Sequence, residues 1–235
     1  SVSDIHDMTR GELPQSLGGL LETTTMTQDQ VNQLIKAIKY GSVVGASDGS
    51  LLPMQRTQFE DYTPPTVGSY GFIIQDEYNN NTYIRGCHVS PNSNTLSTLT
   101  TESFGCIALL TTIHLLCAQG RLDVYDEEMN TILVGLDNQE VYERTMMDPP
   151  EMNTSDYLRP EWDLWKIMRM LLRVIPVKIE FTKVQAHQDE NEEGKIINGP
   201  FDLMTTMNME ADTLATIARG HAQELTVPRP VFSYT

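Results

Sequence analysis

The stretch SVVGASDGSLLP, residues 42–53, places an aspartate and a glycine directly after a short apolar run. Residues 43–46 are typical of a buried strand, whereas Asp48 and Gly49 are typical of a turn. We therefore predict a strand over 42–48. Asp48 then has two interpretations: it begins a turn, or it is a carboxylate that a rigid sheet presents to a metal ion. The rest of the chain must supply partners for the second interpretation.

Composition limits the class of protein. The 235 residues are 40% apolar, which is enough for a substantial core in one large domain or in one domain with extensions. The net charge of −16 argues against nucleic acid and against an acidic membrane surface, since both are bound through Lys and Arg. We find no signal peptide and no run of about 18 apolar residues, so no membrane span is expected. Cys87, Cys106 and Cys117 predict reduced thiols and an intracellular location, in cytoplasm or nucleus.

The spacing of apolar residues predicts three strands followed by alternating helices and strands. A capping box at Thr27 and Gln30 predicts a short amphipathic helix over 28–40. The predicted strands cover 42–48, 69–76, 82–89, 131–137 and 177–184, with a turn at 79–81. The other predicted helices cover 101–118, a segment beginning near Pro160 with an apolar stripe from Leu164 to Ile175, and 208–219.

This order of elements predicts an α/β fold with a mixed sheet and helices on its faces. Strands that are joined through helices should be parallel, with right-handed crossovers. We predict one domain over 27–220 that includes the added helix at 28–40. An irregular N-terminal arm would occupy 1–26, and a C-terminal tail or linker would occupy 221–235.

Four acidic residues fall at or near the ends of consecutive predicted elements: Asp48, Glu102, Asp137 and Asp212. Each has an ordinary interpretation as a turn, helix-end or surface residue. If the first and fourth strands are neighbours, however, the carboxylates meet in one crevice at the strand ends. Carboxylates packed together raise one another's pKa, and a hard divalent cation such as Mg²⁺ relieves the repulsion. Two such ions can support phosphodiester hydrolysis.

From Ser42 to Arg219 the chain resembles the type 1 ribonucleases H, with the family's motifs in the family's order. The segments that carry the resemblance are SDGS followed by GSYGFIIQD, then STLTTESFGCIALL, LDNQEVY, FTKVQAH and NMEADTLA. The resemblance implies a ribonuclease H-like mixed five-stranded sheet, with three antiparallel strands and then two parallel strands, and with helices on both faces.

The resemblance also implies a set of functional residues. The family's catalytic, metal-binding carboxylates correspond to Asp48, Glu102, Asp137 and Asp212, and they imply two Mg²⁺ ions, for which Mn²⁺ can substitute. The family's mobile histidine, which assists proton transfer or product release, corresponds to His187. The substrate-contacting positions correspond to Ser97, Thr98, Asn138 and Gln139, of which the last two would read the minor groove.

The implied activity is an endonuclease that cuts the RNA strand of an RNA/DNA hybrid and leaves 3′-OH and 5′-phosphate ends. The acidity of the chain conflicts with this activity: residues 138–158 hold one basic residue, Arg144, where the family's stronger binders carry a basic protrusion. A fused or associated reverse transcriptase could supply the missing affinity. The chain begins at Ser1 without Met, which also suggests a piece of a retroelement polyprotein.

Two other classes of protein remain open. A catalytically silent relative could act as a structural or protein-interaction module, which the acidity favours and the four carboxylates oppose. A transposase or integrase on a related fold is the second alternative. Glu102 argues against it, because those enzymes lack an essential acid on the helix after the third strand.

Overall fold

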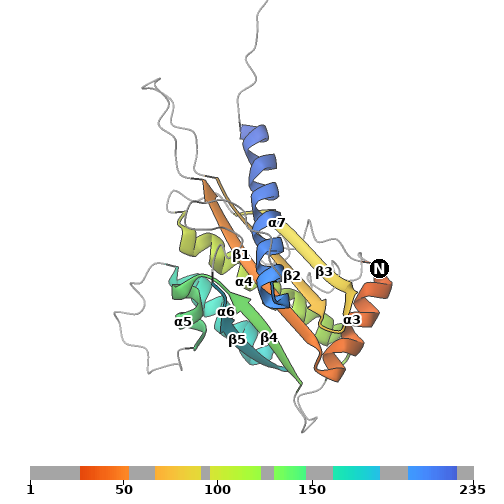
Figure 1. The fold of residues 1–235 in the computed structure, drawn as a ribbon. Helices are drawn as coiled ribbons and strands as arrows, with labels where there is room; N and C mark the ends of the chain where they lie inside the picture. The colour runs from red at the N-terminus through yellow and green to blue at the C-terminus, as the bar shows by residue number, and fades with distance from the viewer. Residues whose placement is uncertain are drawn as a thin grey trace, which may run out of the picture.

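The computed structural model describes residues 27–52, 67–90, 96–122, 130–146, 161–185 and 201–226. The predicted arm at 1–26 lies outside these ranges. In chain order the elements are α3 (Gln28–Tyr40), β1 (Val43–Leu52), β2 (Val67–Asp76), β3 (Asn79–Val89), α4 (Thr98–Gln119), β4 (Thr131–Leu136), α5 (Gln139–Met146), α6 (Trp162–Val174), β5 (Lys178–Lys183) and α7 (Leu203–Thr226) (Figure 1).

The five strands form one mixed sheet in the order β3-β2-β1-β4-β5. β1, β2 and β3 pair antiparallel, whereas β4 pairs parallel with β1 and β5 pairs parallel with β4. This arrangement confirms the predicted sheet, including the expectation that the first and fourth strands are neighbours. The strand that contains Asp48 and the strand that ends just before Asp137 therefore lie side by side.

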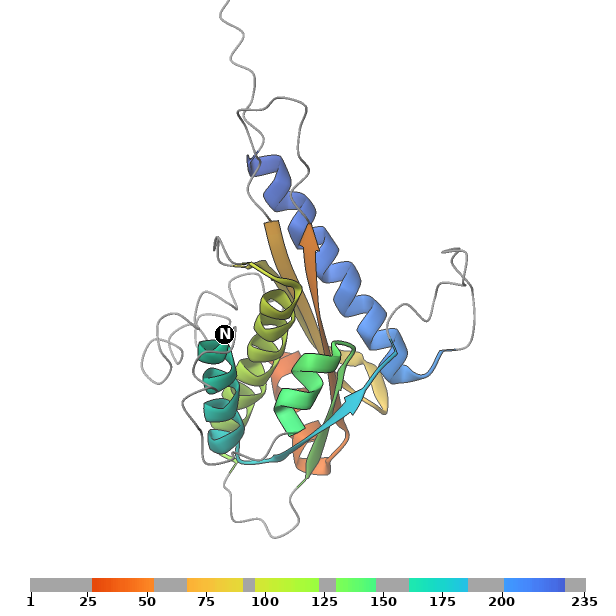
Figure 2. The ribbon, with the colours of Figure 1, turned by 90° about the vertical axis from the view of Figure 1, so that its left-hand side faces the viewer.

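Helices cover both faces of the sheet, as predicted. Figure 2 shows α4 and α6 on one side of the sheet and α7 on the other. The larger core cluster joins α3, α4 and α6 to the sheet, and its fully buried members include Leu34, Ile107 and Leu171. A smaller cluster beneath α7 contains Val44 and Met207. Two separate apolar layers thus fix the helices that carry Glu102 and Asp212.

Helix α4 forms the centre of the larger layer. By length and composition alone it could cross a membrane, but 83% of its most apolar window is buried inside the protein. A core helix passes the same test, so the packing of α4 accounts for its apolar character. The helix begins at the N-cap Ser97, whose side chain accepts a hydrogen bond from the backbone N–H of Thr100. It therefore starts one turn earlier than the predicted range 101–118.

The N-terminal helix confirms the local signals in the sequence. Thr27 and Gln30 form the reciprocal capping box, and α3 covers Gln28–Tyr40. Gly41 ends the helix with φ 69°, a left-handed conformation that glycine adopts at little cost. The buried face of α3 then packs on the main core.

The first hairpin differs from the prediction in two places. β1 continues through Asp48 to Leu52, because its pairing with β2 extends as far as Val67. The turn between β2 and β3 lies at residues 77–78 and not at 79–81. The carboxylate of Asp76 accepts a hydrogen bond from the backbone N–H of Tyr78 at 3.2 Å, which stabilises this earlier turn.

The later helices also differ from the prediction. The sequence analysis missed α5, which begins where Asn138 accepts hydrogen bonds from the N–H groups of Glu140 and Val141. α7 begins at Leu203, because Asp202 caps it through the N–H of Thr205 at 2.7 Å. α7 also extends to Thr226, into the segment predicted as a tail.

Candidate active site

Strand β1 extends beyond the end of its neighbour β4, and this difference in length creates the candidate site. The parallel pairing ends at Ser47 and Leu136, whereas β1 stays paired with β2 as far as Leu52. On the β4 side, the backbone at Asp48 and Gly49 therefore has no partner in β4. The backbone groups of β1 that face β4 at these residues can therefore hydrogen-bond to side chains.

Three carboxylates converge at this level. One oxygen each from Asp48, Glu102 and Asp137 lies within 4.8 Å of the other two. Asp48 and Glu102 are buried, with 6% and 8% of their surface exposed, and Asp137 is half-buried. They come from β1, from the N-terminal part of α4 and from the residue that follows β4. The structure thus brings together three of the four carboxylates that the sequence analysis singled out.

Gly49 holds two of these carboxylates in place. Its backbone N–H donates to Oδ1 of Asp48 at 2.7 Å and to Oε2 of Glu102 at 3.0 Å. A Cβ atom at Gly49 would lie 2.4 Å from the backbone nitrogen of Glu102. Glycine is therefore required for the N-terminal end of α4 to approach β1. Gly105 has a similar role one turn later, where a Cβ would lie 3.1 Å from the carbonyl oxygen of Asp48.

The fourth carboxylate, Asp212, approaches from the opposite face of the sheet. Gly71 pairs with Asp48 across β1 and β2, and a Cβ at Gly71 would lie 2.3 Å from the carbonyl oxygen of Ala211. The backbone of α7 therefore packs directly on β2 beside Asp48. The charge of Asp212 raises the pKa of Asp48, although its carboxylate lies outside the group of three.

Asn208 belongs to the site but was not among the predicted site residues. It is 5% exposed, and its Nδ2 donates to Oδ2 of Asp137 at 3.3 Å. Within the described residues, Oδ1 of Asp137 and Oδ1 of Asn208 are buried without a hydrogen-bond partner. The signal was present in the sequence: Asn208 precedes Asp212 by four residues, so the two share one face of α7.

The pKa of Asp48 rises from 3.8 to about 8, mainly because burial disfavours its charged form. The nearby charges of Asp137 and Asp212 add to this rise. Burial likewise raises the pKa of Glu102 well above its ordinary value, and the charges of Asp48 and Asp137 raise it further. Without a cation, the cluster therefore retains protons near neutral pH.

The donor set fits a hard divalent cation. Every converging ligand is a carboxylate oxygen, which is the ligand type that Mg²⁺ and similar ions prefer. A buried acceptor without a donor costs about 1–3 kcal/mol, and Oδ1 of Asp137 is such an acceptor within the described residues. A cation bound here would satisfy that oxygen and offset the mutual repulsion of the carboxylates.

Of the two predicted substrate-contacting residues at the start of α4, Ser97 already has a protein partner. Ser97 donates through Oγ to Oε1 of Glu161 at 2.6 Å, and the hydroxyl of Thr100 donates to the same oxygen at 2.9 Å. Thr98 is exposed in the first turn of α4. Glu161 thus places a carboxylate at the N-terminal end of α4, where an anion is electrostatically favoured.

The remaining predicted residues lie after β4 or beyond the described chain. Asn138 caps α5 through its Oδ1, and the exposed Gln139 donates to Glu143 at 2.7 Å. His187 falls in the segment 186–200, which lies outside the described residues. Its predicted role therefore stays a prediction.

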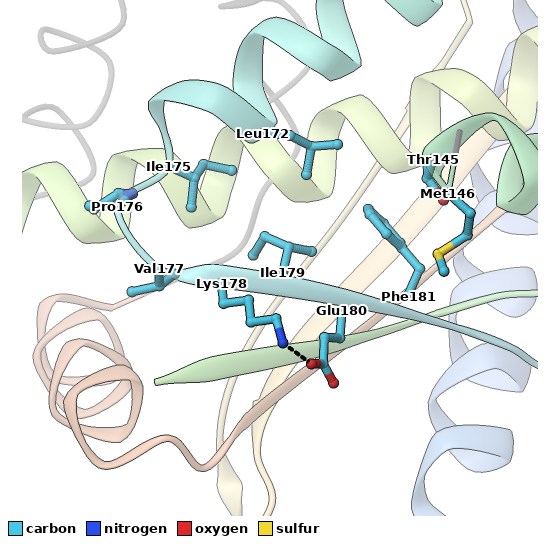
Figure 3. Close-up of a pocket in the computed structure, with 10 residues that line it drawn as sticks. All are labelled: Thr145, Met146, Leu172, Ile175, Pro176, Val177, Lys178, Ile179, Glu180 and Phe181. Atoms are coloured by element: carbon cyan, nitrogen blue, oxygen red, sulfur yellow. Dashed lines mark hydrogen bonds and ion pairs between the residues drawn. The ribbon is translucent and has the colours of Figure 1, made fainter. Parts of the chain in front are cut away.

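An apolar surface cavity lies away from the carboxylates (Figure 3). It has a volume of about 770 Å³ and lies among α5, the end of α6 and the first part of β5. Ile179 and Phe181 point into it, whereas Lys178 and Glu180 form an ion pair on the other side of β5. No acidic cluster lines this cavity, so the carboxylates of Asp48, Glu102 and Asp137 remain the better candidate for chemistry.

The mixed five-stranded sheet, its order and the helices on both faces define the ribonuclease H-like fold. A solved structure that is similar to this chain, LC9-RNase H1, is described as a type 1 RNase H with the type 2 active-site motif. It aligns with a TM-score of 0.50 over 76% of this chain and 72% of its own, at 13% sequence identity. At this identity the likeness establishes the fold. No protein-family model and no curated protein sequence matches the chain.

Proposed function

We propose that this protein is a divalent-metal-dependent endonuclease that hydrolyses the RNA strand of RNA/DNA hybrids. The observation that carries the proposal is the convergence of Asp48, Glu102 and Asp137 within 4.8 Å on a ribonuclease H-like sheet. The fold alone supports a nuclease-like protein only in general terms. A buried cluster of repelling carboxylates adds specific support, because a protein-interaction module has no use for it.

The metal would be held by Asp48, Glu102 and Asp137, with Asp212 as the fourth ligand. We propose two Mg²⁺ ions, for which Mn²⁺ can substitute; when bound, such ions activate water and stabilise the leaving oxygen. Gly49 fixes the orientation of the Asp48 and Glu102 carboxylates through its N–H. Asn208 orients Asp137 through its side-chain Nδ2–H. These hydrogen bonds orient the ligands before any substrate arrives.

Other residues would act on the substrate. We propose that His187 moves a proton to or from the leaving group or assists product release, as the sequence resemblance implies. Asn138 and Gln139 would contact the minor groove, where the ribose 2′-hydroxyl distinguishes RNA from DNA. Ser97 and Thr98 would contact the backbone near the N-terminus of α4. For Ser97, this requires Glu161 to give up its hydrogen bond.

The net charge of −16 opposes binding of a polyanion. We therefore propose that the domain works with a fused or associated reverse transcriptase, inside the cell, in a retroelement polyprotein. The partner would supply the affinity for the hybrid, and this domain would supply the cut. The proposal predicts weak binding by the isolated domain and a strong dependence on low salt.

The test is cleavage of an end-labelled RNA/DNA hybrid at low salt with Mg²⁺ or Mn²⁺. We expect cutting of the RNA strand alone, loss of cutting with EDTA, and at least a hundredfold loss in Asp48→Asn. The exposed Asp163 in α6 provides the matched control, and Asp163→Asn should cut at the wild-type rate.

A folded protein that cuts neither strand with either metal would contradict the proposal. The alternative would then be a catalytically silent ribonuclease H-like module with a structural or protein-interaction role. Cutting of duplex DNA with strand transfer would instead indicate a transposase-like or integrase-like enzyme.

A further inference from the structure

Two basic side chains flank the carboxylates at different ends of the cluster. Lys183 ends β5, and its ammonium group donates to the backbone carbonyl of Asp137 and, at 3.1 Å, to that of Val184. Arg219 lies on α7, and its guanidinium donates to the hydroxyl of Ser50 at 2.7 Å. One cation thus lies beside the end of β4, and the other lies beside the extended end of β1.

The placement of Arg219 follows from the periodicity of two elements. Ser50 comes two residues after Asp48 on β1, so both side chains point to the same face of the sheet. Arg219 comes seven residues after Asp212 on α7, which is two helical turns along the same face. Arg219 therefore lies beyond the carboxylates, where α7 contacts the extended end of β1.

Neither cation is paired with an acidic side chain among the described residues. Three other basic side chains are so paired, in the ion pairs Arg85–Glu210, Arg144–Glu140 and Lys178–Glu180. Lys183 and Arg219 are instead anchored by neutral oxygens. Arg219 has five N–H donors and Lys183 has three, which leaves donors for a further ligand.

We propose that Lys183 and Arg219 bind backbone phosphates of the nucleic-acid strand on either side of the phosphate that the carboxylates cut. This inference rests on the proposed function. It adds two positioning residues that compensate locally for the overall negative charge. Anchored cations are suited to binding phosphates, because hydrogen bonds between charged groups are the strongest in proteins.

A purely structural role makes a different prediction for each residue. If Arg219 only ties α7 to β1, its loss lowers stability and leaves substrate affinity unchanged. If Lys183 only caps the ends of β4 and β5, the same holds. The salt dependence of substrate binding separates the two cases, because each lost phosphate contact lowers the slope of log affinity against log salt by about 1.

The experiment measures KM and kcat for hybrid cleavage by the full chain with Mg²⁺ across a KCl series. We expect Arg219→Gln and Lys183→Gln each to raise KM roughly tenfold with kcat nearly unchanged, since a hydrogen bond to a charged group is lost. In each variant, the slope of log affinity against log salt should also fall by about 1. Arg219→Lys keeps the charge and should restore most of the slope. The control is Arg173→Gln, which removes an exposed charge from α6.

The outcomes separate this inference from the proposed function. If the wild type cuts the hybrid and both variants keep its KM and salt slope, the phosphate-binding role is overturned while the proposed function stands. If the variants melt earlier but bind equally well, the residues are structural and the inference is again overturned. If the wild type neither binds nor cuts the hybrid, both are overturned.

Discussion

The backbone N–H of Gly49 donates to a carboxylate oxygen of Glu102 at 3.0 Å, although the two residues are 53 positions apart in the chain. The same N–H also holds Asp48 at 2.7 Å. A single backbone donor therefore sets the distance between two acids from different elements. This hydrogen bond exists because β1 continues past the end of β4 and leaves the N–H without a strand partner there.

The stability of the metal-free protein should fall as pH rises. The pKa of Asp48 is about 8 in the folded state and near 3.8 when unfolded, so the folded state holds an extra proton between these values. The unfolded state then releases protons first, and the free energy of unfolding declines across this window. We expect a loss on the order of a few kcal/mol between pH 5 and pH 8.5, measured by urea unfolding in EDTA.

The same measurement on Asp48→Asn gives the control for this pH dependence. The amide has no proton to lose, so the variant should show a flatter profile and exceed the wild type in stability at pH 8.5. A wild type that is equally stable at both pH values would contradict the raised pKa of Asp48 on which this prediction rests.

Divalent metal should stabilise the protein most strongly at the higher pH. Ions that bind only the folded state at a hundred times their Kd add about 2.7 kcal/mol, which for a chain of this size raises Tm by roughly 5–10 °C. We expect this shift with Mg²⁺ or Mn²⁺ at pH 8 and a smaller one at pH 5.5, where protons compete for the carboxylates. Thermal melting at constant ionic strength measures both.

Variants of two aspartates locate the source of that shift. Asp137→Asn should abolish it, because the half-buried carboxylate at the end of β4 is lost. Asp163→Asn removes an exposed acid of α6 and should keep it. An equal metal-induced shift in both variants would place the bound ion elsewhere on this acidic chain.

Gly71→Ala should separate α7 from the sheet. Its Cβ would lie 2.3 Å from the carbonyl oxygen of Ala211, a backbone atom that can move only with the helix. We expect a loss of about 1–3 kcal/mol in stability and a lower kcat in the folded variant, since Asp212 moves away from Asp48. Denaturant unfolding and hybrid cleavage measure the two effects.

Gly220→Ala supplies the matched control in the same helix. No atom lies within 4 Å of its added Cβ, so the substitution should stabilise α7 by about 0.5–1 kcal/mol and leave kcat unchanged. If both alanine variants behave alike, close packing at Gly71 has no special role in positioning Asp212.

Glu161→Gln should improve substrate binding. The carboxylate of Glu161 accepts hydrogen bonds from Ser97 and Thr100, and its charge repels any phosphate at this helix terminus. The amide retains an acceptor oxygen without the charge, so we expect KM for the hybrid to fall about twofold to fivefold. Asp163→Asn, two residues further along the chain, controls for a general charge effect. An unchanged KM in Glu161→Gln would argue that substrate does not approach Ser97.

Local signals in the sequence determined the elements and their order. The capping box at Thr27 and the glycine at Gly41 fixed the ends of α3, because caps depend on neighbouring residues alone. The apolar periodicities located five strands and the main core helices. The succession of three strands and then alternating helices and strands also led to the mixed sheet, since crossovers through helices require parallel pairing.

Tertiary structure decided how the acids are held. The local sequence predicts that Asp48 starts a turn. Pairing with β2 instead continues the strand through Asp48 as far as Leu52. In the sequence, Asn208 is one polar residue among others on a predicted helix. Only the packing of α7 on Gly71 brings its side chain to Asp137. The residue types of the site were thus written in the sequence. The sequence also predicted that the acids meet at the strand ends. The hydrogen bonds that hold them there were not predicted, because these bonds depend on strand lengths and on helix contacts between residues far apart in the chain.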